Sequence, residues 1–133
     1  NPAVVIINVG HNDAINGTDS TSFQGTMESI IQVALDNGVI PIVTTVYPIP
    51  GYETQTQAIN EATIHAADNM AVPVFNQWRA FNDLAASGLD GIGDPRVAPE
   101  GDDYLAQGLP YGANDRNRRL LIVLKRLIAN FFG

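Results

Sequence analysis

The sequence of 133 residues contains no cysteine, which excludes disulfide bonds, thiolate metal sites and a cysteine nucleophile. It has no apolar run of about 18 residues, so no membrane-spanning helix is expected. Lysine and arginine are absent before Arg79, and the net charge is −7, which argues against nucleic acid as a partner. These absences are compatible with either compartment, and an exported bacterial protein is slightly favoured over a cytoplasmic one.

Apolar runs alternate with segments of helical periodicity. The runs at 3–9 and 39–46 are rich in Val and Ile, and the first is typical of a strand buried on both faces of a parallel sheet. A further short strand is predicted at 72–75. Helices are predicted at 22–37, 54–70, 77–87 and 113–131, the first with Ser22 as its N-cap, and loops at 10–21 and 88–112. This order predicts an α/β fold, a three-layer α/β/α sandwich with a parallel sheet.

The first predicted strand is apolar enough to be a central strand with a neighbour on each side. The sequence easily supplies only one such neighbour, and it has neither an initiator methionine nor a signal peptide. We therefore expect residues 1–133 to be a single domain that lacks its N-terminal strands, which an upstream segment or a second chain would supply. Alone, the chain is expected to aggregate or pair through this strand.

In open α/β sheets, sites form beyond the carboxyl ends of the strands, where 10–13, 44–52 and 90–111 should meet. Gly10 allows a tight turn, and the Asn12 amide can donate a hydrogen bond to a developing oxyanion. Asp13 can orient Asn12 or cap the local backbone. The residues alone leave two interpretations open, an oxyanion donor and a simple Asx-turn after a strand.

The stretch NPAVVIINVGHND resembles the third block of the SGNH, or GDSL, hydrolase family, which is a strand followed by G-x-N-D. INEATIHAADNMAVPVFN and LPYGANDRNRRL are similar to later segments of that family, so the resemblance covers nearly the whole chain. It implies an ester hydrolase with a serine nucleophile, no cofactor and no metal, acting on an acyl or acetyl ester of a carbohydrate or lipid. It also implies that Asn12 is an oxyanion donor.

Around Asn12 we expect a small-molecule ester or carbohydrate ligand to contact Gly10, His11, Asp13 and Tyr47. For His11, a loop or substrate-contact role is favoured over a catalytic one. His65, the other histidine, falls in the middle of a predicted helix, which favours a structural role.

Two parts of the family's catalytic triad are missing from the sequence. Asp90 fits the Asp of the family's D-x-x-H block, but Gly93, or Asp94 with a slip of one residue, stands where the His belongs. No G-D-S motif occurs anywhere in the chain. As it stands the chain is therefore catalytically incomplete, and a non-catalytic pseudo-hydrolase that binds a ligand or a protein is the alternative.

An acidic loop follows the third predicted helix, 77–87. Five acids crowd this loop, namely Asp90, Asp94, Glu100, Asp102 and Asp103. Their spacing does not match an EF-hand, so a solvated acidic loop is favoured over a calcium site.

Overall fold

The computed structural model describes residues 3–99 and 107–131. The chain divides into two compact units, Asn1–Gln77 and Trp78–Gly133, and each is described by itself. The expectation of a single, N-terminally truncated domain stays a prediction.

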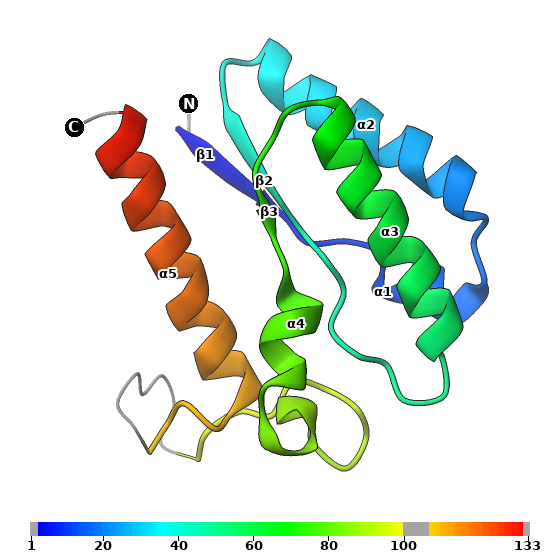
Figure 1. Ribbon diagram of the computed structural model, residues 1–133, viewed down its shortest axis with the longest axis vertical. Helices are drawn as coiled ribbons and strands as arrows, with labels where there is room; N and C mark the ends of the chain where they lie inside the picture. The colour runs from blue at the N-terminus through cyan, green and yellow to red at the C-terminus, as the bar shows by residue number, and fades with distance from the viewer. Residues whose placement is uncertain (1–2, 100–106, 132–133) are drawn as a thin grey trace. The chain divides into compact units, whose positions relative to one another are not determined.

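The first unit contains a parallel sheet of three strands, β1 (Val4–Ile7), β2 (Ile40–Thr44) and β3 (Val74–Phe75), in the order β1-β2-β3 (Figure 1). Val4 pairs with Ile40 and Val43 pairs with Val74, both in parallel register. The three predicted strands and their parallel arrangement are confirmed, although each strand is shorter than the apolar run that predicted it.

Three helices belong to the first unit, α1 (His11–Asn16), α2 (Ser20–Asp36) and α3 (Glu53–Asn69). Figure 1 shows α2 and α3 side by side, and they pack closely against each other. The core lies between these helices and one face of the sheet, and its members include Ile7, Phe23, Met27, Ile31, Val43, Ile59 and Ala66. The chain is thus an α/β protein with helices flanking a parallel sheet.

The sequence-based prediction of a loop over 10–21 is wrong in part, because α1 occupies half of that segment. The prediction that Ser22 caps the next helix is also wrong. Helix α2 begins at Ser20, and the Asp19 carboxylate accepts a hydrogen bond of 2.8 Å from the backbone N–H of Ser22. Asp and Ser are equally good caps, so the residue types alone could not separate these two registers.

Strand β1 lies at the edge of the sheet formed by the described residues, where β2 is its one neighbour. The described chain therefore supplies one neighbour for this strand, as the sequence indicated, and a second neighbour stays a prediction.

The second unit contains the end of α4 (Gln77–Asn82), a 3₁₀ turn (Ala85–Gly88) and α5 (Gly112–Phe131). The helix predicted over 77–87 is thus interrupted after Asn82, whereas the last helix begins one residue from its predicted start.

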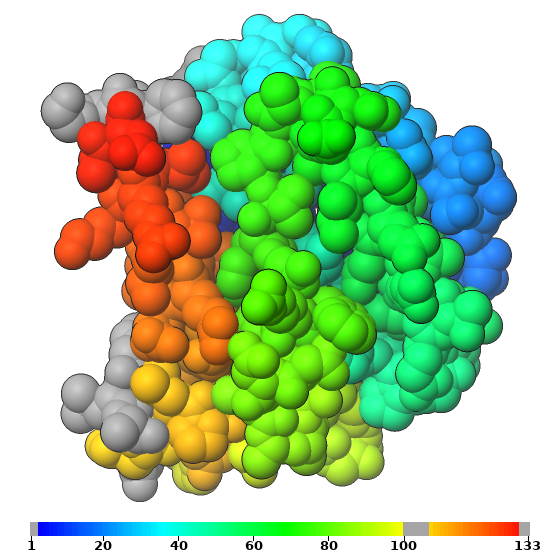
Figure 2. All heavy atoms as spheres, in the orientation of Figure 1, coloured from blue at the N-terminus to red at the C-terminus, as the bar shows by residue number. Residues whose placement is uncertain are grey.

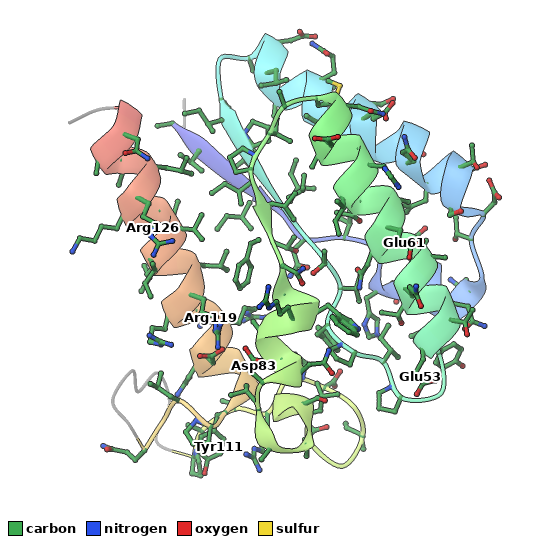
Figure 3. The ribbon with its side chains drawn as sticks, in the orientation of Figure 1. Glu53, Glu61, Asp83, Tyr111, Arg119 and Arg126 are labelled. Carbon is green, nitrogen blue, oxygen red and sulfur yellow. The ribbon has the colours of Figure 1, made fainter. Side chains whose placement is uncertain are left out.

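Near the start of α5, the buried Asp115 carboxylate accepts a hydrogen bond of 2.6 Å from Arg119 Nε. The same Arg119 approaches Asp83 at 3.8 Å, and Figure 3 shows these two side chains close together.

The outer face of α3 is exposed to solvent, as Figure 2 shows. His65 lies on this face rather than in the core, and its side chain makes no hydrogen bond to a described residue.

Among the residues described, no helix is both long enough and apolar enough to cross a membrane.

Candidate active site

Gly10 forms the turn that ends the β1 segment and begins α1. Its φ is +109°, in the region that favours glycine. A Cβ placed on it would lie 2.8 Å from Ile59 Cγ2, 3.0 Å from Val46 Cγ2 and 3.2 Å from Phe23 Cζ. Backbone conformation and packing therefore both require glycine here. This explains why the first residue of G-x-N-D is a glycine.

Asn12 follows at the carboxyl end of β1, in the first turn of α1. It is exposed, and its side-chain amide forms no hydrogen bond with any described residue. Its Nδ2 group is thus available to donate to a ligand oxygen. An Asx-turn closed by the Asn12 side chain, which the sequence left open, is absent from the described residues.

His11 and Tyr47 come together from the carboxyl ends of neighbouring strands. Their ring centroids lie 5.3 Å apart, at an interplanar angle of 40°. Both residues are partly exposed, and the His11 Nδ1 atom is buried without a hydrogen-bond partner in the part of the chain that the structure describes. The structure therefore brings together two residues predicted to contact the ligand, and one of them, His11, directly precedes Asn12 in the chain.

Two asparagines that the sequence analysis did not assign to the site hold the strand ends in place. Thr44 Oγ1 donates to Asn8 Oδ1 at 2.9 Å, which joins the ends of β1 and β2. Buried Asn60 on α3 accepts from Val46 N at 2.7 Å and donates to Val46 O at 3.0 Å. The sequence signals for them are that Asn8 is a polar residue inside the apolar run 3–9 and that Asn60 is the second residue of the stretch INEATIHAADNMAVPVFN.

Asp13 lines a pocket of about 190 Å³ between the end of the β1 segment and α2, and neither His11 nor Tyr47 lines this pocket. The other lining residues are mostly apolar or hydroxylic, namely Val9, Thr18, Ser22, Phe23, Thr26, Met27 and Ile30.

Asp90 belongs to the second unit, so the structure describes the two parts of the expected site separately. Its Oδ1 atom accepts hydrogen bonds of 3.0 Å from the backbone N–H groups of Ile92 and Asp94. The Asp90 N–H donates to the Asp94 carbonyl at 2.8 Å, so the segment closes into a tight turn. One oxygen of the Asp90 carboxylate is therefore already used within its own turn.

Gly93, at the position where the resemblance implies a histidine, has a φ of +92°. An L-residue with a side chain is strained in this conformation. The turn that holds Asp90 is thus shaped for glycine at this position.

The start of α5 is fixed to the loop after Asp90. Ala113 N, in the first turn of α5, donates to Arg96 O at 3.2 Å, and the Arg96 guanidinium lies 4.7 Å from the centre of the Tyr111 ring.

No group of three or more His, Asp or Glu side chains within 3–99 and 107–131 is placed to hold a metal ion. Glu100, Asp102 and Asp103 lie outside these ranges.

Comparisons with known proteins agree with this arrangement. Residues 1–105 match the model of the GDSL-like lipase/acylhydrolase family. A GDSL-like lipase from Bacteroides thetaiotaomicron VPI-5482 has a similar fold, with a TM-score of 0.65 and 19% identity over 94% of this chain. A protein from Desulfitobacterium hafniense DCB-2, assigned to the G-D-S-L family of lipolytic proteins, gives a TM-score of 0.57 and 21% identity over 81% of this chain.

The chain spans 63% of the length of the Bacteroides protein and 59% of that of the Desulfitobacterium protein. A search of curated proteins gives no match. Because the family model covers well over half of the sequence, the chain belongs to the GDSL-like lipase/acylhydrolase family.

Proposed function

We propose that this chain forms part of an ester hydrolase and that Asn12 donates a hydrogen bond to the tetrahedral oxyanion. The observation that carries the proposal is the exposed, unpaired amide of Asn12 directly after the turn that Gly10 makes possible. A fixed donor in this position stabilises charge that develops only in the transition state.

The rest of the reaction needs a nucleophilic serine and its base, and the family's motifs for both are missing from this sequence. A serine would attack the acyl carbon, a base would take its proton, and the leaving alcohol would be protonated in turn. The substrate is an acyl or acetyl ester of a carbohydrate or lipid, and His11 and Tyr47 would form one side of its site. In the first step the new Ser–acyl bond replaces the ester bond, and water then releases the acid.

The role of Asn12 can be tested in the full-length natural protein with p-nitrophenyl acetate. Asn12→Ala should lower kcat by roughly 10²–10³-fold with little change in KM, because the oxyanion forms only in the transition state. Asn16→Ala, on the same short helix and also exposed, is the matched control and should keep kcat. Equal kcat values for the two variants would remove Asn12 from the mechanism.

The turn around Asp90 favours a second candidate function, a pseudo-hydrolase that binds a ligand or a protein without turning it over. Asp90 uses one carboxylate oxygen to close its own turn, and Gly93 has a positive φ where the resemblance implies a histidine. A site that lacks this base would bind an ester without activating a serine.

Labelling the full-length protein with a serine-directed phosphonate separates the two functions. An adduct together with turnover supports the hydrolase, and the absence of both supports the binding module.

The free energy of unfolding of Gly93→His should be about 1–2 kcal/mol lower than that of Gly91→His, because position 93 has a positive φ whereas a Cβ at position 91 meets open space. New turnover in Gly93→His alone would indicate a triad that has lost its histidine and would support the alternative, whereas turnover in the unmodified protein would contradict it. A Gly93→His protein as stable as Gly91→His would contradict the strain expected at position 93.

A further inference from the structure

We propose that Asn16 is a site of self-modification, at which its side chain cyclises with the backbone nitrogen of Gly17 and is converted to a mixture of isoaspartate and aspartate. Asn16 is the last residue of α1, and both it and Gly17 are exposed. The proposal rests on the hydrogen bonds of this turn and does not depend on ester hydrolysis.

The reaction is the intramolecular one that an asparagine followed by glycine can undergo. The Gly17 nitrogen loses its proton to hydroxide and attacks the side-chain carbonyl carbon of Asn16. A new C–N bond forms, the bond to the side-chain nitrogen breaks, and ammonia leaves with a proton taken from water. Water then opens the cyclic imide at either carbonyl, which gives aspartate or isoaspartate. Glycine favours the attack because it has no Cβ beside the nucleophilic nitrogen.

The sequence contains this dipeptide twice, as Asn16-Gly17 and Asn37-Gly38. Both asparagines are exposed, and each lies at the C-terminal end of a helix, α1 or α2. The two glycines have nearly the same φ, +67° and +69°. Because the two sites match in dipeptide, exposure and φ, their hydrogen bonds decide which of them reacts faster.

The side chain of Asn37 is held by a hydrogen bond, whereas that of Asn16 is not. Asn37 Nδ2 donates to Val33 O at 2.7 Å, which directs this side chain back along α2. The Asn16 side chain forms no hydrogen bond with any described residue. Asn16 can therefore turn its carbonyl carbon toward the next backbone nitrogen, while Asn37 must first break a hydrogen bond to do so.

The two backbone nitrogens differ in the same direction. Gly38 N donates to Leu35 O at 2.9 Å, whereas Gly17 N donates to Ala14 O at 3.3 Å. The second distance exceeds the usual range for such bonds, which is about 2.7–3.2 Å. Because the nitrogen must lose its proton before it attacks, the weaker bond leaves Gly17 the better nucleophile. Both differences thus favour reaction at Asn16.

Conversion of Asn16 weakens α1. The product has a carboxylate three residues after Asp13, and α1 has no basic residue in its last turn. Like charges at this spacing repel, and a carboxylate at the C-terminus of a helix faces the negative end of its dipole. Isoaspartate also adds a carbon atom to the backbone where Thr18 N donates to Asp13 O at 2.9 Å. The modification therefore loosens the short helix that carries Asn12.

The experiment incubates the folded, full-length natural protein in mildly alkaline buffer and follows each asparagine by mass spectrometry. Cleavage after glutamate separates the two sites, because Glu28 lies between Asn16 and Asn37. Asn16 should react about three- to tenfold faster than Asn37, which is the factor expected from one additional hydrogen bond to break. Chromatography of the peptides should resolve both isoaspartate and aspartate, since the cyclic imide opens on either side.

Urea and glycine variants are the controls. In urea the hydrogen bonds of both turns are lost, so the rates at Asn16 and Asn37 should approach each other. Gly17→Ala should slow the reaction at Asn16 alone, and Gly38→Ala should slow it at Asn37 alone. A Cβ at either glycine meets open space and both have a positive φ, so the two variants are matched in strain. Circular dichroism checks that each variant is folded.

Hydrogen exchange tests the effect on α1. The amide of Ala14, which donates to Gly10 O at 2.9 Å, should exchange faster in Asn16→Asp than in Asn16→Ala, because only the first variant adds a carboxylate. Asn37→Asp is the matched control at the end of α2, and it should leave exchange in α1 unchanged. This readout needs no turnover, so a protein that modifies itself without hydrolysing esters would remove only the proposed function.

Four results would overturn the proposal. The first is an Asn37 that reacts as fast as Asn16 in the folded protein, or an Asn16 that reacts only in urea. The second is a ratio of the two rates that is the same in the folded protein and in urea, since neighbouring residues would then control the reaction. The third is aspartate without isoaspartate, which would exclude the cyclic imide. The fourth is equal exchange in Asn16→Asp and Asn16→Ala, which would remove the effect on α1.

Discussion

At the scale of single residues, Gly10 is the position where the site depends most on one residue type. Its positive φ and its contacts with Ile59 and Val46 leave no place for a side chain. The turn could be predicted from the sequence, because a glycine directly after an apolar run is a common turn signal. The three surrounding side chains could not be predicted, since they come from distant parts of the chain.

Gly10→Ala should lower the free energy of unfolding by about 2–4 kcal/mol, from backbone strain and overpacking together. Urea denaturation followed by circular dichroism measures this change. Gly25→Ala is the control: its Cβ would meet open space on α2, and it should raise the free energy of unfolding by about 0.5–1 kcal/mol. Similar changes in both variants would contradict the crowding at Gly10.

At the scale of elements, Asn60 fixes the end of β2 to α3 through two hydrogen bonds to Val46. Asn60→Ala would leave both buried backbone groups of Val46 unpaired and should lower the free energy of unfolding by about 2–4 kcal/mol. Gln55→Ala, at an exposed position of the same helix, should change it by less than about 0.5 kcal/mol. A small effect at Asn60, measured by urea denaturation, would show that water replaces its hydrogen bonds.

The start of α2 should respond to acid. The hydrogen bond from Ser22 N holds the pKa of the Asp19 carboxyl below its ordinary value of 3.8. Because the folded pKa is lower than the unfolded one, Asp19 stabilises the fold above that ordinary value and loses this effect as the pH falls through the folded pKa.

We expect Asp19→Ala to lower Tm near about pH 6, and this difference from the parent chain should shrink near about pH 2.5. Thermal unfolding at the two pH values measures it. Asp36→Ala, at the other end of α2, removes a carboxylate that faces the negative end of the helix dipole and should not lower Tm at about pH 6. A Tm difference for Asp19→Ala that stays constant with pH would contradict the capping argument.

At the scale of the whole molecule, charge is divided unevenly between the two units. Residues 1–77 contain seven acidic residues and no lysine or arginine, whereas the remaining residues contain seven acids and seven cations. The acids of the first unit include Glu53 and Glu61, which project from α3 in Figure 3. The carboxylates of this unit repel one another, and the unit contains no lysine or arginine to offset that repulsion.

Raising NaCl from about 10 to about 200 mM should therefore raise Tm, because salt screens this repulsion. Thermal unfolding by circular dichroism is the measurement. Choline chloride at the same ionic strength should give the same increase, since screening does not depend on the cation. A fall in Tm with either salt would show that the ion pairs around Asp115 outweigh the repulsion.

The sequence by itself determined the strands, the long helices and the position of G-x-N-D, because hydrophobic period and glycine placement are local signals. The match to a known family followed from the same residues. Even there, local signals set the elements only approximately: α1 and the start of α2 at Ser20 were missed because several capping residues compete over 10–22.

Only the tertiary structure decided how the polar residues are used. It shows that the Asn12 amide makes no hydrogen bond to the residues described, that Asn60 holds the end of β2, and that Asp90 closes its own turn. It also places β1 at an edge of the sheet formed by the described residues. These properties depend on which groups meet in space and which backbone angles they impose, and residue types along the chain do not determine either.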